Sequence, residues 1–116
     1  MKRIHNTNEI IGTSKKGSIE IEFDELIKTF GEPDIPEYSD GKVQVKWIFK
    51  IGGAVITIYD YKSSVSPEQN TVWSIGGNNH YCPRYVKEAL DSVDSFYVRI
   101  TEESFRNGKF VQKEIK

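Results

Sequence analysis

Cysteine is nearly absent from this chain, since Cys82 is the only one among 116 residues. A single thiol excludes a disulfide within the chain, and the N-terminus has no apolar run typical of a signal peptide or a membrane span. We therefore expect an intracellular protein without a membrane partner. The surroundings of His5 and His80 match no Cys–His nucleophile motif, which favours a small buried thiol at Cys82.

An excess of charge of either sign is lacking as well. Sixteen Lys and Arg against seventeen Asp and Glu give a net charge of -1, which argues against a protein that coats long nucleic acid. A small anionic ligand needs only a local pair of cations and stays possible. His80 and Cys82 are too few ligands for structural zinc, and no dinucleotide or Walker motif is present. We expect no catalytic residue, no metal and no cofactor, and therefore no enzyme.

The length predicts a single domain over residues 1–116. Alternating and helical apolar patterns predict its elements. The first half of the chain is predicted to contain a hairpin of strands 9–14 and 18–23 joined by Lys15-Lys16-Gly17, a helix over 24–30 and an acidic loop over 32–41. Strands 43–49 and 54–62, joined by Gly52-Gly53, follow, and then a polar loop over 63–70 and a strand over 71–75. The last part is predicted to be a helix from Pro83 with an apolar stripe reaching Val93, and strands 96–101 and 109–115 joined through Asn107-Gly108. We expect an α+β fold, mainly an antiparallel twisted sheet with two helices.

Aromatic residues, lysines and glycines gather between residues 40 and 79, the mixture expected of a nucleotide site and also of an ordinary sheet. Trp47 alternates with Val45 and Phe49, which predicts a core position. The candidate ligand-binding residues are Tyr59, Tyr61 and Trp73 for stacking, Lys62 and Arg84 for phosphate, and Gly76, Gly77, Asn78 and Asn79 for backbone or base-edge contacts.

Each of these residues also has a purely structural interpretation. Gly76-Gly77 would allow a tight turn between a strand and a helix, and Asn78 or Asn79 would cap that helix. Tyr61 would belong to the core, and Lys62 would be an exposed lysine that protects a sheet edge. Both interpretations remain open from the sequence.

Four short blocks occur in a fixed order between residues 18 and 90: Phe30-Gly31-Glu32-Pro33, Asp40-Gly41-Lys42-Val43, Ile58-Tyr59-Asp60-Tyr61-Lys62 and Trp73-Ser74-Ile75-Gly76-Gly77. In these blocks the chain resembles a widespread family of small phage and viral proteins. By the same blocks it resembles the anti-CBASS sponge family. The resemblance implies a homo-oligomer, dimer or tetramer, that works in the cytoplasm of the infected host cell. It would bind a cyclic dinucleotide such as cyclic GMP-AMP without cleaving it.

Two other functions compete with this one. The acidic segment 32–40 would suit a protein-protein inhibitor of a host defence enzyme, of the anti-CRISPR type. A nuclease or phosphodiesterase is the least favoured, because no credible catalytic set is present.

Overall fold

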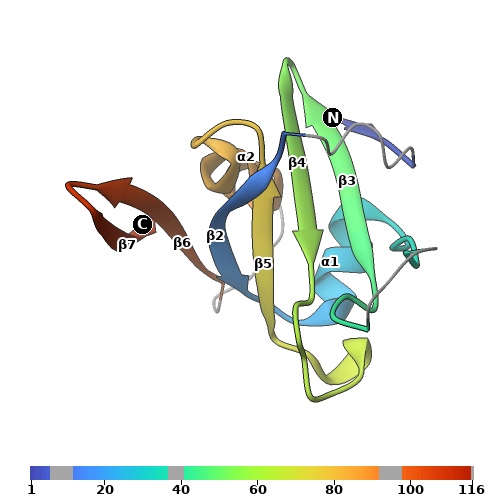
Figure 1. Cartoon of the computed structure of the whole chain (residues 1–116). Coiled ribbons are helices and arrows are strands. Elements are labelled where there is room, and N and C mark those ends of the chain that lie inside the picture. Colours follow the sequence, from blue (N-terminus) through green and yellow to red (C-terminus); the bar gives the residue numbers. More distant parts are fainter. Residues whose placement is uncertain (6–11, 37–40, 92–97, 116) are drawn as a thin grey trace.

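The computed structural model describes residues 1–5, 12–36, 41–91 and 98–115, which form one antiparallel sheet with two α-helices on the same face (Figure 1). The strands are β1 (Lys2–Arg3), β2 (Ser14–Glu20), β3 (Lys46–Ile51), β4 (Ala54–Tyr59), β5 (Val72–Gly77), β6 (Arg99–Arg106) and β7 (Lys109–Ile115), in the spatial order β1-β3-β4-β5-β2-β6-β7. The helices are α1 (Phe23–Phe30) and α2 (Cys82–Leu90), with a short 3-10 helix η2 (Pro67–Gln69) in the polar loop. The predicted α+β class is confirmed.

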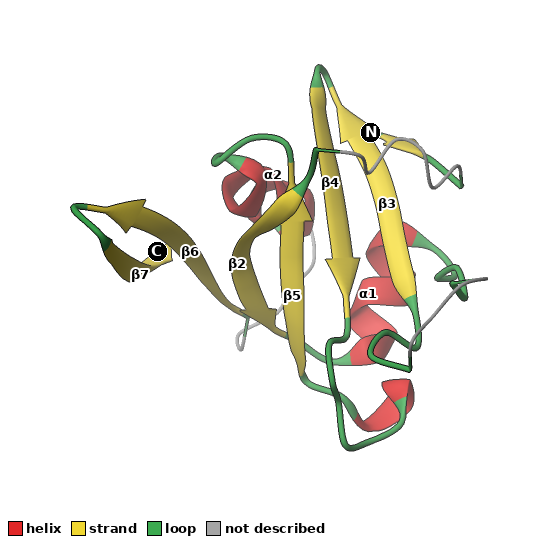
Figure 2. Ribbon diagram, in the orientation of Figure 1, coloured by secondary structure: helices red, strands yellow, loops and turns green. Residues whose placement is uncertain are grey.

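Both helices form where the apolar spacing predicted them and pack on the rear face in Figure 2. Leu26 and Phe30 of α1 are buried, and Gly31 ends the helix at φ 87°, where its N–H donates to the carbonyl of Ile27 at 2.8 Å. Val86 and Leu90 anchor α2, whereas the predicted extension to Val93 lies outside the described residues. Among the described residues, no helix is long and apolar enough to cross a membrane.

An aromatic cluster fills the space between α1 and the sheet. Trp47 has no exposed surface, and its ring meets those of Trp73 and Phe23 edge to face, at centroid distances of 5.5 and 5.9 Å. Edge-to-face contact suits the charge distribution of aromatic rings. The predicted core position of Trp47 is confirmed.

The hairpin predicted around Lys15-Lys16-Gly17 is wrong. The strand β2 runs through these residues and pairs with β5 on one side and β6 on the other, with an irregular register between Lys15 and Gly17. Residues 9–11 of the predicted partner strand lie outside the described part. A Cβ atom at Gly17 would overlap the carbonyl oxygen of Thr101 and lie 2.9 Å from Cγ of Pro83. Gly17 is therefore required by close packing of β2 against β6 and α2, and not by a turn.

We expect Gly17→Ala to lower the free energy of unfolding by about 1–3 kcal/mol, because the new methyl group must displace backbone. Gly53→Ala is the matched control, since a Cβ atom there would meet nothing within 4 Å, and its effect should stay within about 0.5 kcal/mol. Urea denaturation of both variants measures the difference. Equal effects at the two glycines would contradict the packing role of Gly17.

Gly76 and Gly77 do not form the predicted turn, because they are the last two residues of β5 and both are buried. A Cβ atom at Gly76 would lie 2.5 Å from Oγ1 of Thr57, and one at Gly77 would lie 2.6 Å from the carbonyl oxygen of Val55. The glycines let neighbouring groups approach the strand closely. They are not arranged as a phosphate-binding loop.

The remaining connections follow the expected turn chemistry. Gly52-Gly53 joins β3 to β4, with Gly52 at φ 58°. Asn107 and Gly108, at φ 52° and 75°, form the two-residue turn between β6 and β7. The strand predicted over 54–62 ends earlier, at Tyr59, and this early end shapes the site described next.

Candidate functional site

Asp60 fixes the chain just after β4. Its carboxylate has no exposed surface and accepts hydrogen bonds from the backbone N–H groups of Gln44 and Val45 at 2.8 and 3.1 Å, and from the Gln44 side chain at 2.9 Å. A buried carboxylate is stable only when its oxygens are paired in this way. Asp60 therefore fastens the segment before β3 to the end of β4, where Tyr61 and Lys62 follow.

Tyr61 and Lys62 form an exposed aromatic and cationic corner at this point. The side chain of Tyr61 is 52% exposed, and Nζ of Lys62 lies 5.5 Å from the centre of its ring. The ring of Tyr59 meets that of Tyr61 at a right angle, with 6.5 Å between the centroids. The corner offers a flat surface for stacking and an ammonium group beside it.

Lys62 has a left-handed backbone conformation, with φ at 51°. Its N–H donates to the carbonyl of Lys42 at 2.7 Å, which holds the conformation. A side chain other than glycine costs about 1–2 kcal/mol in this region of φ and ψ. A lysine at a position that suits glycine suggests that its side chain has a role, because strained backbone tends to occur at functional sites.

Tyr59 lies on the sheet face away from the helices, directly opposite Lys46 on β3 and Ser74 on β5. Burial raises the pKa of the Tyr59 phenol above its ordinary value of 10.0. A hydrogen bond to the Ser74 side chain opposes this rise in pKa, and the nearby Tyr61 and Glu103 add to it. The phenol therefore stays protonated at neutral pH.

Several polar residues near Tyr59 were not predicted from the sequence. Glu103 on β6 contributes to the field at the phenol, and its carboxylate pairs with Nζ of Lys15 at 3.3 Å. Strand register brings these residues to the same face, from positions some forty residues before and after Tyr59. Only the sheet topology could have identified them.

Trp73 does not join this corner, because it belongs to the core. Its side chain is 1% exposed, and its indole N–H donates to the carbonyl of Ile21 at 3.1 Å. Phe23 covers the ring edge to face at a centroid distance of 5.9 Å. The predicted stacking role would require the core to open.

Asn78 and Asn79 lie at the opposite end of β4 from Tyr59. The side-chain oxygen of Asn78 accepts the N–H of Val55 at 2.9 Å, and that of Asn79 accepts the N–H of Tyr81 at 2.8 Å. Both side chains hold the turn that leads into α2. The predicted helix cap is wrong, because the N-cap residue of α2 is Tyr81 and no side chain forms a capping hydrogen bond there. Neither asparagine reaches the corner of Tyr61 and Lys62.

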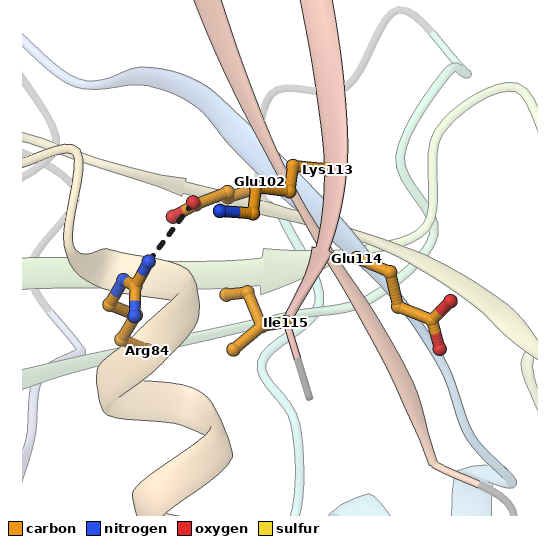
Figure 3. A pocket seen from close by; sticks show the side chains of 5 residues that line it. All are labelled: Arg84, Glu102, Lys113, Glu114 and Ile115. Atoms are coloured by element: carbon orange, nitrogen blue, oxygen red, sulfur yellow. Dashed lines mark hydrogen bonds and ion pairs between the residues drawn. The ribbon is translucent and has the colours of Figure 1, made fainter.

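Arg84 is separated from the corner as well, because it lies on α2 at the helix-bearing face. It lines a cavity of about 350 Å³ with Glu102, Lys113, Glu114 and Ile115, and its guanidinium pairs with Glu102 at 3.2 Å (Figure 3). Figure 3 shows Lys113 beside Glu102, whereas Glu114 points away. Glu114 pairs with Arg99 at 3.5 Å, so Glu102 is the carboxylate that faces the two cations, and it already holds the Arg84 guanidinium. An anion that bound in this cavity would have to compete with Glu102 for the guanidinium of Arg84.

Cys82 and the two histidines each have a neighbour in the fold. Burial raises the pKa of the Cys82 thiol, and its Sγ contacts the carbonyl oxygen of Val55 at 3.6 Å. His5 is bonded to Asp34, and His80 rests against the ring of Tyr81. In residues 1–5, 12–36, 41–91 and 98–115, no group of three or more His, Cys, Asp or Glu could hold a metal ion.

The acidic loop also serves the fold where the structure describes it. Asp34 pairs with Arg3 at 3.4 Å and with His5 at 2.9 Å, and its backbone forms a bridge with Lys46. Residues 37–40 of the segment lie outside the described part.

Comparison of the chain with protein-family models, curated proteins and solved structures found no match.

Proposed function

We propose that the protein binds a cyclic dinucleotide, such as cyclic GMP-AMP, at the corner formed by Tyr59, Tyr61 and Lys62. The ligand is held and released without cleavage. A protein of this kind removes an immune signal in the cytoplasm of a host cell infected by the phage that encodes it. The observation that carries this proposal is a lysine, Lys62, in a left-handed backbone conformation with its ammonium group over the exposed ring of Tyr61.

The composition of the corner supports a ligand that has both bases and phosphates. A base stacked on Tyr61 contributes on the order of 1–3 kcal/mol. Lys62 lies over the ring of Tyr61, and Lys46 is directly opposite Tyr59 on the neighbouring strand, so each tyrosine has a lysine as a neighbour. Ammonium groups form charge-assisted hydrogen bonds with phosphate oxygens.

The symmetry of the ligand favours more than one copy of the chain. A cyclic dinucleotide has two bases and two phosphates, related by an approximate two-fold axis when both bases are purines. A dimer with matching symmetry supplies every contact twice. Two corners that each contribute several kcal/mol would reach a micromolar dissociation constant, which corresponds to about 8 kcal/mol. A homo-oligomer, dimer or tetramer, is therefore part of the proposal.

Lys62→Gly tests the role of the lysine because it separates stability from binding. Glycine tolerates the left-handed conformation, so the free energy of unfolding should stay equal or rise by up to about 1 kcal/mol. The loss of the ammonium group should weaken binding of cyclic GMP-AMP about tenfold or more, as measured by isothermal titration calorimetry. Tyr61→Ala should weaken binding to a similar degree.

Lys28→Ala is the matched control, since this exposed lysine lies on α1, on the other face of the sheet from the corner, and pairs with Glu25 at 3.4 Å. Its binding should equal that of the unmodified protein. The proposal fails if no cyclic dinucleotide or trinucleotide in a panel binds to the unmodified protein. It also fails if Lys62→Gly binds normally. Recovery of intact nucleotide after heat denaturation of the complex distinguishes sequestration from cleavage.

A further inference from the structure

The strand β7 is an open edge of the sheet. It is last in the strand order and pairs only with β6 among the described strands, and six of its seven residues are exposed. Figure 1 shows the hairpin of β6 and β7 projecting away from the rest of the sheet. A long open edge offers unpaired backbone groups to another strand.

The hairpin also exposes a pair of phenylalanines. Phe105 and Phe110 lie opposite each other, are 66% and 76% exposed, and meet edge to face at a centroid distance of 5.3 Å. Val111 follows Phe110, is 43% exposed and lies on the other face of the strand. Clustered apolar side chains at the surface mark interaction sites more often than single ones do.

The turn determines which backbone groups point outward. In a two-residue hairpin the flanking residues, here Arg106 and Lys109, exchange hydrogen bonds, and such pairs alternate along the ladder. The backbone groups of Phe110, Gln112 and Glu114 therefore face away from β6. They are the donors and acceptors available to a further strand.

We propose that β7 pairs antiparallel with β7 of a second copy of this chain, about a two-fold axis through Gln112. This register uses all seven residues of the strand and opposes Phe110 to the partner's Glu114 and Val111 to the partner's Lys113. Like charges never lie opposite each other in it. A shift of the axis by one residue toward the turn places Lys109 opposite the partner's Lys113, and a shift the other way opposes the two copies of Lys113. Charge therefore selects the register, since like charges directly opposite destabilise a strand pair.

The same register covers the exposed phenylalanine. The carboxylate of Glu114 pairs with Nε of Arg99 at 3.5 Å, on the face of the sheet that carries Phe110. In the dimer the ring of Phe110 lies beside this ion pair of the partner, and the contact occurs twice. A guanidinium next to an aromatic ring is a favourable contact. The interface is independent of the nucleotide corner on β4 and does not rest on the proposed function.

Two substitutions at Val111 test the proposal with opposite signs. Val111→Glu places a carboxylate opposite the partner's Lys113 and should tighten the dimer, whereas Val111→Lys opposes two ammonium groups and should raise its dissociation constant about tenfold. Sedimentation velocity over a concentration series measures both constants without nucleotide. Axes through other residues of β7 do not oppose Val111 to Lys113, so they predict no such tightening by Val111→Glu.

Gln112→Pro is a second test, because it removes an outward N–H group at the axis and leaves the backbone hydrogen bonds with β6 in place, at the cost of the exposed side-chain hydrogen bond from Gln112 to Glu103 at 3.2 Å. It should abolish the dimer while the far-UV circular dichroism spectrum stays that of the folded chain. The inference is overturned if the unmodified protein stays monomeric at high micromolar concentration. It is also overturned if both Val111 variants shift the constant in the same direction, or if neither shifts it.

Discussion

Replacing Trp73 with alanine is expected to lower the free energy of unfolding by about 3–5 kcal/mol. The side chain is 1% exposed and lies between the rings of Phe23 and Trp47, so its removal leaves a large cavity. It also leaves the carbonyl of Ile21 without its hydrogen bond. A domain of this size has a total stability of about 5–15 kcal/mol, so the loss is a large share of it and should lower the urea midpoint clearly.

Val72→Ala is the matched control, because Val72 precedes Trp73 on β5, faces the other side of the sheet and is 55% exposed. Its effect should stay within about 0.5 kcal/mol. Urea denaturation followed by far-UV circular dichroism measures both variants. If Trp73→Ala were as stable as the control and instead lost nucleotide binding, Trp73 would be a ligand contact and not a core residue.

Asp60→Ala should lower the free energy of unfolding by about 2–5 kcal/mol, because it removes the acceptor for the N–H groups of Gln44 and Val45. Val45 is buried, so its N–H group would be left without a partner. Water has little access to Asp60 itself, which has no exposed surface. Thermal denaturation measured by calorimetry would report the loss.

Asp60→Asn provides a graded comparison for the same site. The amide oxygen can still accept the two backbone N–H groups, whereas the new NH₂ group faces the side-chain amide of Gln44. The loss should therefore be smaller than in Asp60→Ala. Because Asp60 positions the next two residues, both variants should also weaken binding at Tyr61 and Lys62, in the same order as their losses of stability. An unaltered stability in Asp60→Ala would contradict the role of the carboxylate.

Local patterns were sufficient to predict most of the elements. Helical spacing identified α1 and α2, and alternation identified β3, β4 and the core position of Trp47. The same alternation on β5, with Trp73 and Ile75 buried and Val72 exposed, could have placed Trp73 in the core as well. Its aromatic ring was instead interpreted as a ligand contact.

The errors concern contacts between distant segments. Gly17 resembles a turn residue by its local sequence, but its role depends on Thr101, which is more than eighty positions away. Gly76 and Gly77 were misinterpreted for a similar reason, since their close neighbours belong to β4 and α2. A glycine required by close approach has no local signal that distinguishes it from a turn glycine.

The candidate site was predictable only where its residues are adjacent in the chain. Tyr59, Tyr61 and Lys62 are nearly consecutive and remain together in the structure. Lys46 and Ser74 join Tyr59 through strand pairing, and Arg84 is excluded by its place on the other face of the sheet. Strand order and register, which determine both outcomes, are properties of the whole fold.

The central position of β2 has a consequence for how the chain folds. This strand comes early in the sequence, but its two neighbours, β5 and β6, are synthesised about sixty and eighty residues later. Closing such long loops before any contact forms is entropically costly, and sheets of this kind fold slowly. During synthesis, β2 has no partner on either side until most of the chain has emerged. We expect folding to begin with the local hairpin of β3 and β4 and to end when β6 docks on β2.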